Sequence, residues 1–300
     1  MADGTVSAQR GEEILVHVDA CDACRELVAH LGALDGPARR VGRYQIERVL
    51  GVGGMGIVYA AFDPQLQRRV AVKLVRPENT DERAQAHLLA EARALGRISH
   101  PNVVTVYDAG EHDGQIYVAT ELVDGTTLAD WQAQQRSADD IACAWFQVAP
   151  GLAAAHAVGI VHGDVKPSNV LIGRDGRVRI GDFGLHAGTP AYMAPEQDAG
   201  RGEARSDQYA MCVAIVEGIT GVRPRADARV ALESRALAAL VARGLRSDPA
   251  ARFATMDELA DALARAIALV PPTRGRAAVL AMTTSAIIAA ASLAMLLVSS

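Results

Sequence analysis

The stretch Val161–Gly184 reads VHGDVKPSNVLIGRDGRVRIGDFG, and it holds four polar side chains that can carry chemistry: Asp164, Lys166, Asn169 and Asp182. Two apolar runs, 170–172 and 178–180, are separated by Asp175-Gly176. This pattern predicts two short strands joined by a tight turn. A hairpin keeps its two ends close together, so we expect the carboxylates before and after it to share one site.

These four side chains suit phosphoryl transfer, in which the protein mainly positions the reactants and neutralises charge. Asp164 is placed to accept a proton from a substrate hydroxyl group. Lys166 offers a mobile positive charge for the transferred phosphate, and Asn169 and Asp182 offer the hard oxygen ligands that Mg²⁺ prefers. The plainer interpretation is a polar hairpin without shared chemistry, but four groups in this order favour a site.

At these residues the chain resembles the catalytic loop and metal-binding turn of protein kinases. Further landmarks follow in the same order over residues 43–268, and there the sequence resembles the bacterial Hanks-type serine/threonine protein kinases. The resemblance implies an α+β, two-lobed fold with a small antiparallel β lobe and a larger helical lobe. It also implies ATP and Mg²⁺ as cofactors and the serine or threonine hydroxyls of proteins as acceptors.

A glycine-rich stretch, Gly51–Gly56, lies between strands predicted over 44–50 and 57–62. The pattern G-x-G-x-x-G is weak by itself, because it also marks dinucleotide sites, where a helix follows it. Here a turn and a further strand over 70–74 follow instead. That strand carries Lys73 in a V-A-V-K run, which matches the kinase strand whose lysine holds the α- and β-phosphates.

The rest of the implied nucleotide site comes from a helix and a hinge. A helix is predicted over 80–98, and the resemblance makes Glu91 the partner of Lys73; a solvated helix glutamate is the alternative. Strands are predicted over 103–108 and 116–122, and the second leads into a segment that resembles the adenine-binding hinge. The implied ATP-binding residues are Leu50, Gly51, Val52, Gly53, Gly54, Met55, Gly56, Ile57, Val58, Lys73, Glu91, Glu121 and Val123.

Three further residues have architectural or substrate-side roles by the same resemblance. Thr189 matches the threonine that bonds the catalytic aspartate on the substrate side. Glu196 resembles the buried glutamate that pairs with an arginine near the end of the domain, here Arg252. Asp207 resembles the aspartate that anchors the catalytic loop from a central helix.

Alanine-rich helices are predicted over 127–135 and 139–158. Cys143 lies in the second of them, and Cys212 lies in a later helix. We expect both cysteines to serve as small buried hydrophobic residues.

The chain departs from the family pattern in three places. The family's H-R-D motif is His162-Gly163-Asp164 here, so its arginine is missing. Only residues 185–187 separate the D-F-G motif from Gly188, so the activation loop is short. These two losses fit together, because the arginine normally grips a phosphate on that loop. In addition, 221–227 passes quickly to 231–242, which predicts that the usual segment with a substrate-facing helix is shortened.

Composition sets broad limits. A chain of 300 residues can form one or two domains with a substantial core. Its net charge of −5 gives no general attraction to nucleic acid. Four cysteines are too few for a disulfide scaffold in a chain of this length, so free thiols in a reducing compartment are expected.

The N-terminal segment, residues 1–40, contains His17, Cys21 and Cys24 at spacings that share one face of a helix. This pattern resembles the zinc-binding motif of bacterial anti-sigma factors, and it implies Zn²⁺ and a partner for the segment. A tetrahedral structural site needs a fourth ligand, which the sequence does not identify. The alternative is a remnant in which the cysteines are half-buried.

The C-terminal part predicts a membrane anchor. After a linker at 271–276, residues 277–298 carry no charge and, as a helix, span ~33 Å, enough for a hydrocarbon core of about 30 Å. Arg274 and Arg276 favour a cytoplasmic N-terminal side, hence a single-pass protein of the cell (inner) membrane with its kinase domain in the cytoplasm. The alternative is a soluble alanine-rich helix.

Together these observations predict an N-terminal segment (1–40), a nucleotide-binding lobe (41–124), a helical lobe (125–270), a linker (271–276) and a membrane span (277–298). The leading hypothesis is a membrane-anchored serine/threonine protein kinase without the usual activation-loop phosphoregulation. Its rival is a nucleotide-binding scaffold that has lost phosphate transfer. A third hypothesis is a zinc-driven regulator.

Overall fold

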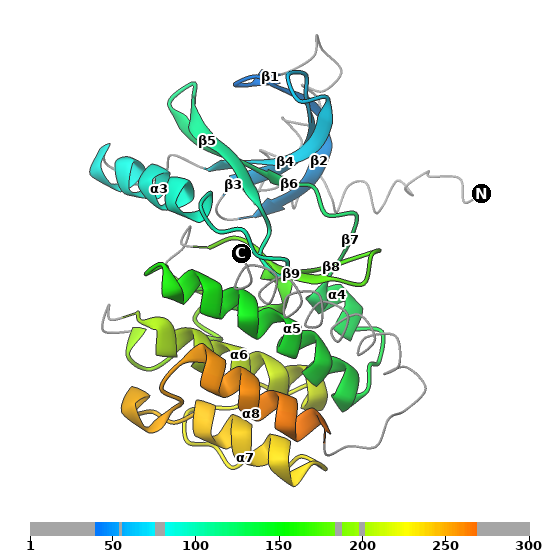
Figure 1. Cartoon of the computed structure of the whole chain (residues 1–300), viewed down its shortest axis with the longest axis vertical. Coiled ribbons are helices and arrows are strands. Elements are labelled where there is room, and N and C mark those ends of the chain that lie inside the picture. Colours follow the sequence, from blue (N-terminus) through cyan, green and yellow to red (C-terminus); the bar gives the residue numbers. More distant parts are fainter. Residues whose placement is uncertain (1–39, 54–55, 76–81, 184–187, 198–201, 269–300) are drawn as a thin grey trace, which may run out of the picture. The chain divides into compact units, whose positions relative to one another are not determined.

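The computed structural model describes residues 40–53, 56–75, 82–183, 188–197 and 202–268 (Figure 1). These residues form two compact units. The first, here called the β unit, contains the described residues up to Arg97 together with 105–122. The second, the helical unit, contains 98–104 and the described residues from Val123 onward.

One antiparallel sheet of six strands makes up most of the β unit, in the order β1-β2-β3-β4-β6-β5. Helix α3 (Glu82–Leu95) contacts β5 and β6. The strands are β1 (Arg40–Val41), β2 (Tyr44–Gly53), β3 (Gly56–Asp63), β4 (Arg68–Val75), β5 (Val106–His112) and β6 (Gln115–Glu121).

The core of the β unit is formed by alternate residues of these strands, as expected when one face of a sheet is buried. Apolar side chains at 57, 59 and 61 of β3 pack with those at 70, 72 and 74 of β4 and with Tyr117 and Ala119 of β6. This alternation explains the strand predictions at 44–50, 57–62, 70–74 and 116–122, which the structure confirms.

Gly56 is required by a close approach of backbones. Its φ is +135°, and a Cβ atom built there would lie 1.9 Å from the Leu74 carbonyl oxygen. We therefore expect Gly56→Ala to lower the free energy of unfolding by about 1–3 kcal/mol, measured by urea denaturation. Gly51→Ala is the matched control, because a Cβ at Gly51 meets nothing within 4 Å. Equal losses in the two variants would contradict the steric argument.

The prediction of a strand over 103–108 was wrong at its N-terminal end. Strand β5 begins at Val106, while Val103 forms an isolated parallel bridge with Ile180 in the helical unit. Ile180 donates its backbone N–H to the Asn102 carbonyl oxygen, and Val104 donates to that of Ile180, both at 2.9 Å. Residues 102–104 therefore pair with the edge of β9 in the helical unit and not with the sheet of the β unit, because the β9 edge satisfies their backbone hydrogen-bonding groups.

The helical unit combines helices α4 to α8 with a sheet of three antiparallel strands, in the order β7-β8-β9. Helix α5 contacts α6, α8 and β9, and α7 contacts α8 (Figure 1). The elements are α4 (Leu128–Gln132), α5 (Ala138–Ala157), α6 (Ala204–Thr220), α7 (Arg235–Gly244), α8 (Met256–Ala268), β7 (Gly125–Thr127), β8 (Val170–Gly173) and β9 (Val178–Ile180).

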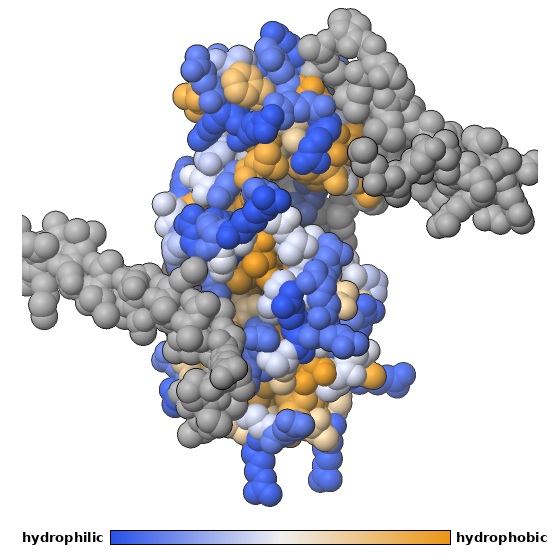
Figure 2. Space-filling view, turned by 90° about the vertical axis from the view of Figure 1, so that its right-hand side faces the viewer, coloured by the Kyte–Doolittle hydropathy of each residue, from blue (hydrophilic) through white to orange (hydrophobic). Residues whose placement is uncertain are grey.

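Both cysteines that the structure describes are buried in helices of this unit, as predicted. Burial raises the pKa of the Cys212 thiol to about 12, so this side chain remains a neutral thiol at ordinary pH. On the face drawn in Figure 2, hydrophilic residues cover most of the described surface, and apolar residues appear as scattered patches. Such scattered patches are normal for a folded protein.

The linker between α6 and α7, residues 221–234, contains no helix, and its shortening relative to the family stays a prediction. Gly221 ends α6 in the left-handed conformation, with φ of +73°. Farther along, the backbone N–H of Asp227 donates to the Leu245 carbonyl oxygen at 2.9 Å, which ties the linker to the end of α7.

The predicted zinc ligands His17, Cys21 and Cys24 and the predicted span 277–298 lie outside the described residues. Among the residues that the structure describes, no group of three or more His, Cys, Asp or Glu side chains is arranged to hold a metal ion. No helix within those same ranges is both long enough and apolar enough to cross a membrane.

Candidate active site

The Asp207 side chain of α6 anchors the start of the catalytic loop, at His162 and Gly163. Its Oδ2 accepts a hydrogen bond from the backbone N–H of His162 and its Oδ1 accepts one from that of Gly163, both at 2.9 Å. Its Oδ2 also contacts His156 Nε2 of α5 at 2.7 Å. The carboxylate is only 1% exposed, so these contacts replace its hydration. The anchoring role predicted for Asp207 is confirmed.

His162 connects the start of this loop to the residues after the hairpin. Its Nδ1 accepts from the backbone N–H of Asp164 at 3.2 Å, and its Nε2 lies 2.9 Å from the Gly181 carbonyl oxygen. Burial lowers the pKa of His162, so the ring is neutral, with its proton on Nε2. The ring also lies against Phe183, with centroids 4.5 Å apart. Both ring nitrogens of His162 thus contact backbone groups of the segments on either side of the hairpin.

Lys166 and Asn169 both contact the Asp164 carboxylate, and Thr189 joins this cluster through Lys166. Lys166 Nζ lies 2.6 Å from Asp164 Oδ2 and donates to Thr189 Oγ1 at 2.7 Å. Asn169 Nδ2 donates to the Asp164 backbone oxygen at 2.9 Å and to its Oδ2 at 3.2 Å. Thr189 was expected to bond the aspartate, and these contacts link the two residues through Lys166.

The hairpin brings Asp182 back beside Asn169, as the sequence predicts. Val170 of β8 is opposite Ile180 of β9, and Gly181 donates its N–H to the Asn169 carbonyl oxygen at 2.9 Å. Asp182 follows with φ of +60°, a left-handed conformation that is costly for a residue other than glycine. The Asp182 side chain is exposed, and its chain neighbour Gly181 is hydrogen-bonded to Asn169.

The predicted nucleotide-binding residues divide between the units. Lys73 of β4 is paired with Val58 of β3 and Val118 of β6. Strand alternation turns it to the face opposite the core residues Val72 and Leu74, yet the residue is only 8% exposed. The remaining described members lie on β2 and β3 (Leu50, Gly51, Val52, Gly53, Gly56, Ile57, Val58), on α3 (Glu91), at the end of β6 (Glu121) and in the helical unit (Val123).

Gly54 and Met55 lie outside the described residues. The pairing of Lys73 with Glu91 stays a prediction.

Glu196 and Arg252 form a buried, two-pronged ion pair, which confirms the predicted partnership. The two Arg252 terminal nitrogens donate to the two carboxylate oxygens at 2.6 and 2.8 Å. Ser206 adds a further hydrogen bond to Glu196 Oε1 at 2.8 Å. Burial alone would raise the pKa of Glu196, but the hydrogen bonds from Arg252 and Ser206 hold it below its ordinary value.

Two sets of contacts near Thr189 could not be read from the sequence. Tyr192 donates its hydroxyl to Glu217 Oε2 at 2.5 Å, and Glu217 Oε1 pairs with Arg223 at 2.7 Å. Burial and the bond to Glu217 raise the pKa of Tyr192 to about 12. In the second set, the Gln197 side chain contacts both Gly163 and Ala194. Tyr192 and Glu217 are 25 residues apart and Gln197 and Gly163 are 34 apart, and no spacing rule pairs residues at such separations.

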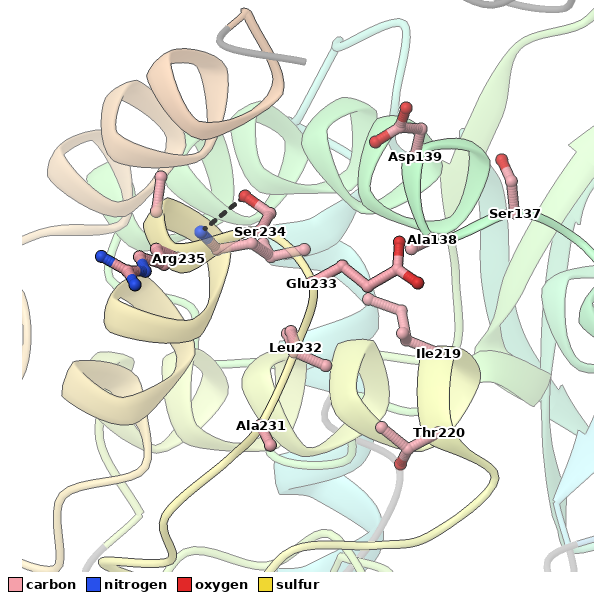
Figure 3. Close-up of a pocket in the computed structure, with 12 residues that line it drawn as sticks. Ser137, Ala138, Asp139, Ile219, Thr220, Ala231, Leu232, Glu233, Ser234 and Arg235 are labelled. Atoms are coloured by element: carbon pink, nitrogen blue, oxygen red, sulfur yellow. Dashed lines mark hydrogen bonds between the residues drawn. The ribbon is translucent and has the colours of Figure 1, made fainter.

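A cavity of about 890 Å³ opens beside the helix-free linker (Figure 3). It lies where the start of α5, the end of α6 and the start of α7 meet. The Ser137 and Ser234 hydroxyls at its wall already cap α5 and α7. None of the predicted catalytic or nucleotide-binding residues lines this cavity.

Residues 44–274 match the protein kinase domain family. The chain therefore belongs to the protein kinase family, and its domain is of the bacterial serine/threonine type. The predicted α+β, two-lobed protein kinase fold is confirmed.

Curated relatives from three bacteria are similar to this chain. PksC, a serine/threonine-protein kinase of Streptomyces coelicolor, is 34% identical over 284 residues, which cover 79% of this chain and 51% of PksC. PknD of Mycobacterium tuberculosis is 34% identical over 257 residues (73% of this chain, 39% of PknD). Pkn1 of Myxococcus xanthus is 38% identical over 232 residues (70% of this chain, 32% of Pkn1). The chain thus aligns with about half of these relatives' length or less.

Among solved structures, the PknI kinase domain of Mycobacterium tuberculosis superposes with a TM-score of 0.70 at 29% sequence identity. The alignment covers 77% of this chain and 99% of that domain.

Proposed function

We propose that this chain transfers the γ-phosphate of ATP to serine or threonine hydroxyls of proteins. The observation that carries the proposal is the cluster in which Lys166 contacts both Asp164 and Thr189. Its positive charge, on Lys166, lies in direct contact with both the proton acceptor Asp164 and the substrate-side Thr189. General acid–base positioning and charge neutralisation are what phosphoryl transfer needs from a protein.

Each residue has a distinct task in this proposal. Asp164 accepts the proton of the acceptor hydroxyl, while Lys166 neutralises charge on the transferred phosphate. Lys73 and Glu91, as the family resemblance implies, orient the α- and β-phosphates. Thr189 fixes Lys166 at the substrate side.

The donors around the hairpin fit Mg²⁺. Asn169 binds Asp164 through Nδ2, so its Oδ1 oxygen takes no part in these bonds, and Asp182 presents an exposed carboxylate. Asn169 and Asp182 would therefore hold the ion through oxygen atoms, its preferred ligands. When bound, Mg²⁺ supplies neutralisation of the phosphate charge.

The test is phosphate transfer by the full chain in detergent, with labelled ATP, Mg²⁺ and a basic protein acceptor. The Asp182→Asn variant serves as the control. We expect transfer by the parent protein and its loss in the variant. Binding of Mg-ATP without transfer to any acceptor would reject the kinase and support the nucleotide-binding scaffold, which the helix-free substrate-side linker favours.

We further propose that residues 277–298 anchor the chain in the cell (inner) membrane, with the kinase domain in the cytoplasm. The uncharged run and the preceding Arg274 and Arg276 support this proposal. Carbonate extraction of membranes tests it: the parent chain should stay in the membrane pellet, whereas Ile288→Arg should release it. Release of the parent chain would reject the anchor.

The zinc hypothesis for His17, Cys21 and Cys24 has a separate readout. One equivalent of Zn²⁺ in the purified full chain, lost in Cys21→Ser, would support it. A metal-free protein would reject it.

A further inference from the structure

The Gln197 side chain bridges two segments of the candidate active site. Its Nε2 donates to the Gly163 carbonyl oxygen at 3.1 Å, and its Oε1 accepts from the backbone N–H of Ala194 at 2.9 Å. Gly163 immediately precedes Asp164, and Ala194 lies in the segment that follows Thr189. One amide therefore uses its donor on the catalytic loop and its acceptor on the substrate-side segment.

Two glycines make this junction close. A Cβ atom on Gly188 would lie 3.1 Å from the Gly163 carbonyl oxygen and 3.0 Å from Met193 Cγ, so any larger residue would require one of these neighbours to shift. Gly163 itself has φ of +76°, which glycine adopts without strain. The Gly163 carbonyl group thus meets the Gln197 amide and the bare Cα of Gly188.

The substrate-side segment is compact enough to carry this restraint to Thr189. The backbone N–H groups of Tyr192 and Met193 donate to the Thr189 carbonyl oxygen at 2.8 and 3.2 Å. Gln197 donates its own backbone N–H to the Ala194 carbonyl oxygen at 2.9 Å. A shift of Ala194 would therefore move the turn that presents the Thr189 hydroxyl to Lys166.

Residues 183–188 provide no phosphorylation site that could hold the substrate-side segment against the catalytic loop. Residues 183–188 read Phe-Gly-Leu-His-Ala-Gly and contain no hydroxyl group that could be phosphorylated. The position next to Asp164 is Gly163, which has no side chain to grip a phosphate. The Gln197 amide is a contact between the substrate-side segment and the catalytic loop that needs no phosphate, and it lies beside the bond from Lys166 to Thr189.

We propose that Gln197 is a positioning residue that holds the segment 189–194 against the catalytic loop and keeps the Asp164–Lys166–Thr189 cluster aligned without phosphorylation. This inference rests on the proposed kinase function. It assigns Gln197 no contact with substrate, and its effect passes through Gly163 and Ala194.

Two substitutions at Gln197 distinguish the roles of its hydrogen bonds to Gly163 and Ala194. Gln197→Ala removes both, and Gln197→Glu keeps an acceptor for Ala194 but turns carboxylate oxygens toward the Gly163 carbonyl group. We expect each to lower kcat for protein phosphorylation by about 10- to 100-fold, because small misplacements of reacting groups are costly. The KM for ATP should change less than about twofold. Gln134→Ala is the control, since Gln134 is exposed and contacts only Arg136 by its side chain.

Steady-state kinetics of the full chain, before and after phosphatase treatment, provide the first test. Equal activity of the parent protein before and after treatment is expected, and a loss on dephosphorylation would overturn the proposal. A kcat of Gln197→Ala within twofold of the parent would also overturn it. So would equal losses in kcat and ATP affinity together with a lowered Tm, which would indicate a merely structural role.

Hydrogen exchange gives a readout that does not depend on activity. The amides of 188–194 should exchange at least about tenfold faster in Gln197→Ala than in the parent protein or Gln134→Ala. If the parent protein transfers no phosphate, the proposed function fails, while faster exchange would still support the bridge. Unchanged exchange in Gln197→Ala would overturn the bridge whether or not the protein is active.

Discussion

Asp164→Asn is expected to lower the rate of phosphate transfer by about 10²–10⁴-fold, the usual contribution of a positioned general base. The amide keeps the shape of the carboxylate but cannot accept the proton of the acceptor hydroxyl. The loop itself should survive, because Asp207 and His162 hold its backbone through three hydrogen bonds, none of which uses the Asp164 side chain. Full-chain kcat with labelled ATP, beside the Kd for Mg-ATP, measures the effect.

The matched control is Asp175→Asn, the same change at the turn of the same hairpin. Asp175 pairs with Arg177 and Arg179, so it lies in the structural part of the hairpin. The phosphate-transfer rate of the Asp175→Asn variant should stay within about twofold of that of the parent protein. Comparable rates for Asp164→Asn and the parent would remove Asp164 from the role of base.

Arg252→Met is expected to lower the free energy of unfolding of the helical unit by about 3–5 kcal/mol. The Arg252 side chain has no exposed surface, and that of Glu196 is only 8% exposed, so the substitution leaves a buried charge without its partner. It also removes the donors to the backbone carbonyl oxygens of Arg205, Arg246 and Ser247. Urea denaturation followed by circular dichroism gives the change.

Arg177→Met provides the comparison, since Arg177 pairs with Asp175 at 2.8 Å but its side chain is 54% exposed. An exposed pair contributes about 0–1 kcal/mol, so the two arginines should differ severalfold. Similar costs for both would contradict the burial argument. If Arg252→Met does not fold, Glu196→Gln removes the same charge pair with less loss of shape and should show an intermediate cost.

The same pair makes a stability contribution that depends on pH. The folded-state pKa of Glu196 lies below the ordinary value of 4.5, so the unfolded protein binds its proton first as the pH falls. The contribution of Glu196 to stability is therefore complete when the pH lies above the ordinary glutamate pKa of 4.5, and it is lost as the pH falls through the lower folded-state pKa. The difference in unfolding free energy between the parent protein and Glu196→Gln should shrink accordingly in acid.

Local patterns made the hairpin and its chemistry predictable. The apolar runs, the Asp175-Gly176 turn and the order of polar residues lie within one short stretch, so near neighbours decide the outcome. The strands that flank the glycine-rich stretch and the strand that carries Lys73 were predictable for the same reason. The pair formed by Glu196 and Arg252 was accessible only through family resemblance, because no periodicity connects residues so distant.

Contacts that depend on competition between distant partners stayed hidden. Residues 103–105 have the composition of a strand, but only the folded chain shows that the edge of β9 takes Val103 away from β5. Likewise, Gln197 is an ordinary polar residue in the sequence, and only the folded chain brings to it the backbone carbonyl group of Gly163, 34 residues away. Long-range hydrogen bonding of this kind leaves no local signal.

The bridge between Val103 and Ile180 also governs how the chain can be divided. Residues 98–104 belong to the helical unit, although β-unit residues flank them on both sides. A fragment beginning at Val123 would lack Val103, which pairs with Ile180 at the edge of β9, and Ile180 lies only two residues before Asp182. The fragment would also lack the hydrogen bond from the Asn102 side chain to the Val178 carbonyl oxygen. No single cut separates the units intact, so a truncated helical fragment would be a poor substitute for the whole protein in studies of catalysis.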